Sequence, residues 1–298
     1  MPGGLRLCGM NKIVVGLDIG GTKMIAASAD AQGRIIRRER MATPRGLDAG
    51  LSLLDEMIAK VRDGAEISGI GAAAGGPLDW RTGVVSPLHQ PEWRDIGLKE
   101  MMEAKYGCGF QVDVDTNLAA LAEYHHAAEK VPKLLYLTIS TGMGGGFVED
   151  GRIYRGMNGA HPEVGHQSVA YRLAEGRTVA CPCGSNGCLE ALVSGSGIRR
   201  LYRKPPEELT GGEWEEVAWN LGQGLRNLAV IYLPDVIVVG GGVAFGARDT
   251  LLGPAVQVMR DHLKIVPHPK VHASEMGEHN VLAGAILLAL RDQASAAL

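Results

Sequence analysis

Short apolar runs and amphipathic segments alternate along the chain, a pattern typical of α/β proteins. Residues 12–17 and 24–28 are apolar and rich in β-forming residues, and they flank a glycine turn at residues 18–23, which predicts a β-hairpin. Apolar side chains at helical spacing predict a helix over residues 48–61, and the apolar run at residues 67–74 predicts the next strand.

The second half of the chain opens in the same way, with a strand, a glycine turn at residues 141–146 and another strand. Two such openings suggest an ancient internal duplication. Further strands are predicted over residues 110–114, 133–139, 147–149 and 236–239. Further helices are predicted over residues 98–106, 117–130, 189–202, 213–232, 248–262 and 283–290. The segment 75–91 is rich in Pro and Gly and is expected to be a loop.

The size of the chain favours more than one folded lobe. Its 298 residues exceed the roughly 100 to 200 of a usual single domain, so two lobes with a cleft for a small substrate are expected. Hydrophobic residues make up 46% and charged residues 21%, which allows a large core. A net charge of -3 without long Lys or Arg runs argues against nucleic acid or an anionic membrane as partner. Neither a signal peptide nor a run of about 18 apolar residues is present, so a cytoplasmic protein without a membrane span is expected.

Three of the five cysteines lie close together in the sequence. Cys181, Cys183 and Cys188, with His166 upstream, form a set of three thiolates and one imidazole that suits tetrahedral zinc. Buried free thiols or a redox pair are the alternatives, which the tight spacing disfavours. Because four protein ligands leave no open position, this zinc is expected to be structural. The odd total argues against a disulfide framework.

Three glycine-rich turns follow predicted strands and suit nucleotide binding, because glycines let backbone N–H groups approach phosphate oxygens. In the first two turns the candidate ATP-binding residues are Asp18, Gly20, Gly21, Thr22, Lys23, Thr141, Gly142 and Gly144. In the third, Gly241 and Gly242 follow the apolar strand at residues 236–239, where missing side chains would let adenine lie against the backbone. Ordinary hairpin turns, and a bend after a strand, are the alternatives.

Carboxylates supply the remaining candidate chemistry. Asp115 follows a predicted strand, and it can accept the proton of a hydroxyl that attacks a γ-phosphoryl group. Its alternative role is to cap the following helix. Asp18 is a candidate to hold Mg²⁺ through water. Glu163 and Glu190 flank the His and Cys cluster and suit hydrogen bonds to sugar hydroxyls, and a solvated loop face is the alternative for each.

These motifs resemble those of the ROK family of sugar kinases and repressors, within the larger group that contains hexokinase and actin. The segments that carry the resemblance are residues 17–23, 112–123, 140–146, 161–166, 181–190 and 234–243. The resemblance implies an α/β, two-lobed actin-like (ribonuclease H-like) ATPase fold with an interlobe cleft and a zinc-stabilised loop. Residues 12–116 with 281–298 are then expected to form the small lobe, and residues 117–280 the large lobe.

The resemblance also implies roles for individual residues. Asp115 falls on the catalytic aspartate of the family, and the implied sugar-binding residues are Gly76, His89, Val114, Asp115, Glu163, His166 and Glu190, with His166 also ligating zinc. The implied reaction is ATP-dependent phosphorylation of a hexose hydroxyl, above all O6 of a glucose-like sugar, with Mg²⁺ and structural Zn²⁺ as cofactors. Family members are commonly dimers or tetramers, so a homodimer or homotetramer is expected.

Two positions depart from the family pattern: many hexose-specific members carry Asn where Val114 stands here, and glucose-type members often carry Asn where His89 stands. The triplet from His161 to Glu163 resembles fructokinase-type members, whereas the compact cysteine run resembles the glucose and N-acetylhexosamine types. Fructose, mannose and amino sugars are therefore alternative substrates.

Two rival functions belong to other classes. A sugar-sensing repressor of the family carries an N-terminal helix-turn-helix domain, and with a first strand predicted near Lys12 no such domain is expected here. A sugar-binding protein without kinase activity is disfavoured by the intact Asp18, Asp115 and both phosphate turns.

Overall fold

The computed structural model describes residues 12–88, 90–173, 176 and 178–296, which fold as two compact units. Unit 1 comprises the described residues up to Leu118 together with those from Val281 onward, and unit 2 comprises Ala119–Asn280. The predicted sugar-binding residue His89 lies outside the described residues.

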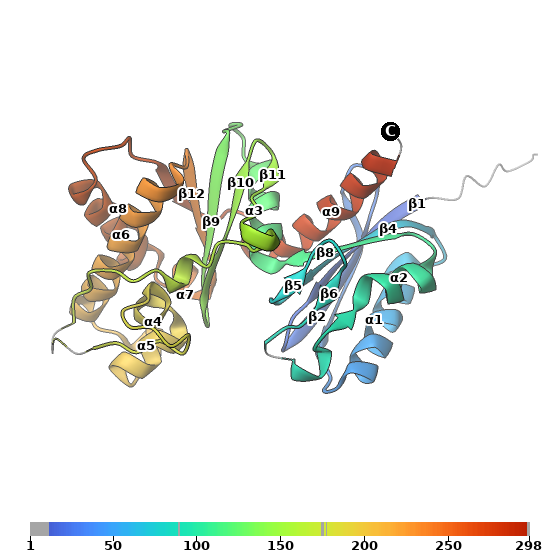
Figure 1. The fold of residues 1–298 in the computed structure, drawn as a ribbon, viewed down its shortest axis with the longest axis horizontal. Coiled ribbons are helices and arrows are strands. Elements are labelled where there is room, and N and C mark those ends of the chain that lie inside the picture. The colour runs from blue at the N-terminus through green and yellow to red at the C-terminus, as the bar shows by residue number, and fades with distance from the viewer. Residues whose placement is uncertain (1–11, 89, 174–175, 177, 297–298) are drawn as a thin grey trace, which may run out of the picture. The chain divides into compact units, whose positions relative to one another are not determined.

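Unit 1 is built on a five-stranded sheet with the order β3-β2-β1-β4-β8 (Figure 1). β1, β4 and β8 run parallel, and β2 and β3 continue the sheet antiparallel. A small second sheet has the order β5-β6-β7. The strands are β1 (Lys12–Ile19), β2 (Lys23–Ala29), β3 (Ile35–Ala42), β4 (Glu66–Ala74), β5 (Leu78–Asp79), β6 (Val84–Val85), β7 (Ile96–Gly97) and β8 (Gly109–Val114). The helices are α1 (Leu47–Arg62), η1 (Pro91–Trp93), α2 (Leu98–Tyr106), the start of α3 (Asp115–His126) and nearly all of α9 (Asn280–Ala296).

Side chains alternate along each strand, so the sheet has two apolar faces, and different helices cover them. Ile13 and Val15 belong to a buried core that α1 and α2 complete. Val14 belongs to a second core, with Ile286 of α9. α9 lies very close to the sheet, since a Cβ atom at Gly71 of β4 would lie only 2.0 Å from a carbonyl oxygen of this helix.

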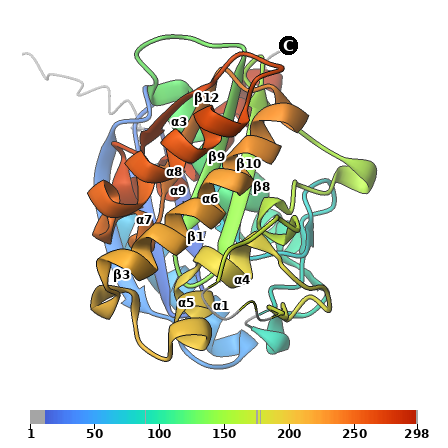
Figure 2. The same cartoon turned by 90° about the vertical axis from the view of Figure 1, so that its left-hand side faces the viewer.

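Unit 2 contains a second five-stranded sheet, with the order β11-β10-β9-β12-β13. Helices α4, α6 and α8 contribute to the buried core against it, and Figure 2 shows α6 and α8 side by side. The strands are β9 (Lys133–Ile139), β10 (Met143–Glu149), β11 (Arg152–Ile153), β12 (Val236–Gly240) and β13 (Lys270–Ala273). The helices after α3 are η2 (Met157–Gly159), η3 (Val164–His166), α4 (Leu189–Val193), α5 (Gly195–Tyr202), η4 (Pro206–Glu208), α6 (Gly211–Tyr232), α7 (Gly242–Gly246), α8 (Arg248–His262) and η5 (Gly277–His279).

The two large sheets share one strand order and one set of directions. In each sheet the first strand is followed by two antiparallel hairpin strands, and two later strands lie parallel to the first strand on its other side. β1 therefore corresponds to β9, β4 to β12 and β8 to β13. A glycine pair follows the middle parallel strand in both units, Gly75-Gly76 after β4 and Gly241-Gly242 at the end of β12. This agreement supports the internal duplication inferred from the sequence. Because ligands of such sheets gather at the carboxyl ends of the parallel strands, each unit is expected to hold one ligand there.

Several elements differ from the sequence-based predictions. Residues 144–146 were expected in a turn but lie in β10, where a Cβ at Gly145 would lie 2.7 Å from Cγ2 of Val164, so glycine is needed on the strand itself. The helix expected over residues 189–202 is divided into α4 and α5, because Ser194 caps α5 by accepting the N–H of Gly197 at 3.1 Å. The segment expected to be a loop contains β5 and β6, and β3 and β13 were not predicted.

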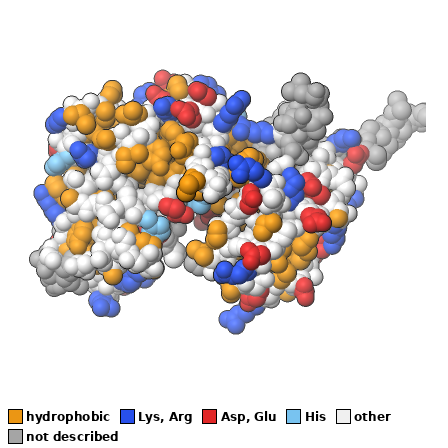
Figure 3. All heavy atoms as spheres, in the orientation of Figure 1, with side chains coloured by type: hydrophobic (Ala, Val, Ile, Leu, Met, Phe, Trp, Pro, Cys, Tyr) orange, Lys and Arg blue, Asp and Glu red, His pale blue; other side chains and the backbone are white. Residues whose placement is uncertain are grey.

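Charges of both signs are distributed over the surface. On the face that Figure 3 shows, positive and negative side chains are interspersed over both units. Within the described part of the chain, no helix is both long and apolar enough to cross a membrane.

Candidate active site and metal site

The first candidate site lies in unit 1, at the carboxyl ends of its parallel strands. Ile19 of β1 pairs with Ala74 of β4, and Ala74 pairs with Val114 of β8, so the three strands end in register. Asp115 then begins α3 directly after β8. The register explains why residues that are nearly a hundred positions apart in the sequence meet at one edge.

A pocket of about 270 Å³ occupies this edge. Five of the residues that were predicted from the sequence line it, namely Asp18, Gly20, Gly21, Gly76 and Asp115. Ile19 of the same glycine motif lines it too, whereas the sequence did not point to the other lining residues, Ala74, Gly75, Pro87, Leu88 and Gln90. Thr22 and Lys23 do not line the pocket; their carbonyl oxygens accept the N–H groups of Thr43 and Gly20, at 3.1 Å each, and so hold the turn.

Asp115 presents an exposed carboxylate at the start of α3. Its Oδ1 accepts the backbone N–H of Thr116 at 2.7 Å, which fixes the side chain, and a helix N-terminus favours negative charge. The neighbouring Asp113 is 1% exposed and accepts Nδ2 of Asn117 at 2.9 Å. Asp113 thus stabilises the junction between β8 and α3, whereas Asp115 faces the pocket.

Val114 does not reach this pocket. Its side chain is 4% exposed and is absent from the pocket lining, in line with the alternation of side chains along β8. Its assignment to the sugar site therefore stays a prediction.

The second candidate site lies at the equivalent edge of unit 2. A pocket of about 370 Å³ is lined there by Thr141 and Gly242, both predicted from the sequence. The other lining residues are Ser140, Gly195, Arg199, Pro206, Glu207, Trp214, Val243, Gly246, Ala247 and Thr250. Ser140 and Val243 belong to the glycine-rich segments 140–146 and 234–243 singled out from the sequence. The others come mainly from α5, α6, α7 and α8 and the connections around them, and no local motif marks these as parts of one site.

The glycines after β12 have separate roles. Gly241 has a φ of 96°, and a Cβ there would lie 2.4 Å from the carbonyl oxygen of Ile139, so this position requires glycine for the fold. At Gly242 a Cβ would meet nothing within 4 Å. Of these two predicted residues, only Gly242 lines the pocket.

Glu190 stabilises the glycine turn between β9 and β10 by a hydrogen bond. Its Oε2 accepts the backbone N–H of Met143 at 2.9 Å, and a Cβ at Gly142 would lie 2.9 Å from the same oxygen. The N–H groups of Gly195 and Ser196 bind the carbonyl oxygens of Ser140 and Thr141 at 2.7 and 3.0 Å. The turn is therefore positioned by the segment that follows the cysteine cluster.

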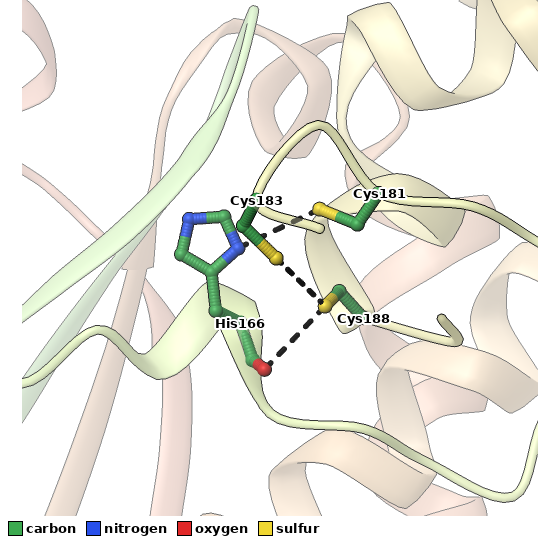
Figure 4. Close-up of side chains that lie close together, drawn as sticks. All are labelled: His166, Cys181, Cys183 and Cys188. Carbon is green, nitrogen blue, oxygen red and sulfur yellow. Dashed lines mark hydrogen bonds between the residues drawn. The ribbon is translucent and has the colours of Figure 1, made fainter. Parts of the chain in front are cut away.

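The predicted metal ligands do come together in unit 2. One ligand atom from each of His166, Cys181, Cys183 and Cys188 lies within 4.8 Å of every other (Figure 4). Nδ1 of His166 is 3.6 Å from Sγ of Cys181, and Sγ of Cys183 is 3.6 Å from Sγ of Cys188. Ligands of a tetrahedral zinc ion at about 2.3 Å would be separated by roughly 3.8 Å, so the donor set and its spacing fit zinc.

The pKa values of two thiols in this cluster are shifted in opposite directions. Burial, with the neighbouring thiols adding to it, raises the pKa of Cys188 to about 12. The backbone amide of Ser185 and the two other thiols lower the pKa of Cys183. A bound cation would lower the pKa of all three thiols, because it stabilises the three thiolates together.

The remaining predicted sugar ligands lie near the cluster in the chain. Glu163 has an exposed side chain, and its Oε1 lies 3.3 Å from Nε2 of His161. The backbone N–H of His166 binds the carbonyl oxygen of Glu163 at 3.0 Å. In Figure 4 the second ring nitrogen of His166 points away from the sulfur atoms, so the ring is able to contact a metal and a further partner.

Comparison with known proteins identifies the family. A model of the ROK family matches residues 14–292. The chain belongs to the ROK family. Among ROK proteins, a hexokinase from Thermus thermophilus is 33% identical, with a TM-score of 0.82 over 95% of this chain and 99% of that one. A glucokinase from Halalkalibacterium halodurans is 31% identical, over 86% of this chain and 87% of its own length.

A ROK glucokinase from Streptomyces griseus, solved with glucose and AMPPNP, is 28% identical, with a TM-score of 0.76 over 94% of this chain and 99% of that one. The family and the mixed α/β, actin-like fold expected from the sequence are thereby confirmed.

Proposed function

We propose that this ROK protein transfers the γ-phosphoryl group of ATP to a hexose hydroxyl, above all O6 of a glucose-like sugar, with Asp115 as general base. The class of enzyme, an ATP-dependent sugar kinase, follows from the ROK hexokinase and glucokinases that match most of the chain. The observation that carries the finer proposal is the pocket in which Asp115 lies with Asp18 and the first glycine turn.

The chemistry requires little more than positioning and charge. The carboxylate of Asp115 accepts the proton of the attacking hydroxyl, and the turn at Gly20 and Gly21 offers space for phosphate oxygens beside it. Asp18 is an oxygen ligand of the kind that Mg²⁺ prefers, and Mg²⁺ would neutralise charge on the transferred phosphate. Glu163, His166 and Glu190 would bind sugar hydroxyls, as the family resemblance implies.

The nucleotide would bind to the pocket of unit 2. Its volume lies in the range usual for small-molecule sites, and it combines the glycine turn after β9 with the apolar surfaces of Trp214 and Val243. Zinc at the cluster of His166 and three cysteines would be structural, because four protein ligands complete its coordination.

The substitution Gly242→Leu should raise the KM for ATP at least tenfold, while the KM for the sugar stays within about twofold. A side chain at this position meets open space rather than protein, so it would occupy the pocket without disturbing the fold. Gly253→Leu is the matched control, since Gly253 also has nothing within 4 Å but lies on α8 outside this pocket. An unchanged KM for ATP in Gly242→Leu would place the nucleotide elsewhere.

The proposed activity is tested by measuring ADP release with glucose, fructose, mannose, N-acetylmannosamine, N-acetylglucosamine and amino sugars. Sugar-dependent ADP release is expected, with glucose or a close analogue preferred. The same panel in a thermal-shift assay distinguishes the rival class. Sugar-dependent stabilisation without ADP release would indicate a sugar-sensing regulator instead of a kinase.

A further inference from the structure

Gln90 is a polar side chain buried in the wall of the Asp115 pocket. It is 7% exposed and directly precedes η1. Its backbone N–H binds the carbonyl oxygen of Pro87 at 3.1 Å, and its own carbonyl oxygen accepts the N–H of Trp93 at 2.9 Å. The main chain is therefore fixed on both sides of the residue, and the side chain is held at the pocket.

The amide nitrogen of Gln90 lacks a partner within the described part of the chain. Nε2 is buried and has no hydrogen bond to any described residue. A buried donor without a partner is costly, and folded proteins retain few of them. An unpaired amide N–H in the wall of a pocket points to a ligand that supplies the missing acceptor.

We infer that Gln90 binds an oxygen of the sugar and determines which sugars are accepted. The inference rests on the proposed function, and it adds a residue that the sequence did not identify. Two carboxylates, Asp18 and Asp115, line the same pocket, and no Lys or Arg is present among the lining residues that the structure describes. Apart from the phosphate group that Mg²⁺ would bring to the glycine turn, an anion is disfavoured beside these carboxylates, and a cation does not need an N–H donor.

A sugar hydroxyl satisfies both kinds of group. It donates a hydrogen bond to a carboxylate and accepts one from an amide N–H at the same time. If the amide of Gln90 is flipped, the hydroxyl can donate to the amide oxygen instead. Gln90 and Asp115 therefore suit neighbouring hydroxyls of one polyhydroxylated ligand.

The test is Gln90→Met, which keeps the length of the side chain and removes both polar atoms. We expect kcat/KM for the best substrate to fall about tenfold, mainly through KM, as for the loss of one neutral hydrogen bond. Deoxy analogues of that sugar locate the contact. Wild type should lose about tenfold on one analogue, and Gln90→Met should lose nothing further on the same analogue.

Stability separates a ligand contact from a packing effect. Because an apolar side chain relieves the unpaired donor, Gln90→Met should raise the melting temperature without sugar and reduce the further rise that sugar produces. The matched control is Gln223→Met on α6, whose Nε2 is likewise buried without a partner among the described residues but lies outside the pocket. That control should change stability and leave the kinetics unaltered.

The outcomes are distinct. Wild-type kcat/KM on every sugar, with an unchanged sugar-dependent melting shift in Gln90→Met, would overturn the role of Gln90 while leaving the kinase intact. A wild type that neither binds nor phosphorylates any sugar would instead defeat the proposed function, and with it this role. If Gln90→Met fails to fold, Gln90→Asn, which withdraws the amide by one methylene, should show the same loss on the same analogue.

Discussion

Asp115→Asn should lower kcat by at least about a hundredfold and leave sugar affinity within about threefold. The amide has the shape of the carboxylate but accepts no proton, and loss of a general base typically costs 10² to 10⁴ in rate. The amide oxygen can still accept the N–H of Thr116, so the start of α3 should be preserved. Initial rates of ADP release, with calorimetric binding of the sugar, measure the two quantities.

Asp113→Asn is the matched control for this substitution. Asp113 lies two positions earlier on β8, is buried, and does not line the pocket. Its variant should lose stability at most and keep kcat within a few-fold, because its oxygen contacts Asn117 and not the ligand space. If Asp115→Asn retains more than about a tenth of wild-type kcat, Asp115 is not the base.

The two candidate sites lie at equivalent positions of the duplicated sheet. In unit 1 the pocket lies beside the first glycine turn and Gly76, and in unit 2 it lies beside the second glycine turn and Gly242. What differs is the third parallel strand: β8 leads into Asp115, whereas β13 leads into a segment that does not reach the pocket. The catalytic carboxylate is thus proposed for one copy of a repeated frame, and the nucleotide site for the other.

The sequence was sufficient where local pattern decides structure. Helix α8 and strand β9 have the predicted bounds, because the pattern of apolar side chains defines both. The Cys3His cluster was also predictable, since its four ligands have a spacing and chemistry that few other sites share.

The sequence was insufficient where the deciding contact is distant. Gly145 looks like a turn residue until Val164 is placed against it, and β3 is so exposed that its apolar signal is weak. Gln90 gave no signal because a Gln in a Pro-rich loop is ordinarily solvated, and only the fold buries it. Arg199 and Thr250 line one pocket through the packing of separate helices, which no local motif records.

Protein purified without added zinc should contain about one zinc ion per chain, and strong chelation should lower its melting temperature by about 10 °C or more. The expected size of the effect follows from the segment between β11 and α4. Within its described residues, regular structure is limited to the short turns η2 and η3 and the isolated bridges from Ser168 to Cys188 and from Ala180 to Asn186. A segment with so little regular structure would depend on a bound metal for its order.

Cys188→Ser should reproduce the effect of chelation, since Cys188 is fully buried and directly precedes α4. Nucleotide binding should weaken as well, because Glu190 in α4 accepts the N–H of Met143 at the end of the glycine turn. The KM for ATP should therefore rise while the melting temperature falls. Cys108→Ser, in unit 1 and remote from the cluster in sequence, is the control and should change neither quantity. Metal analysis, thermal unfolding and KM for ATP measure the three effects, and a zinc-free protein of full stability and activity would show that the cluster is a set of free thiols.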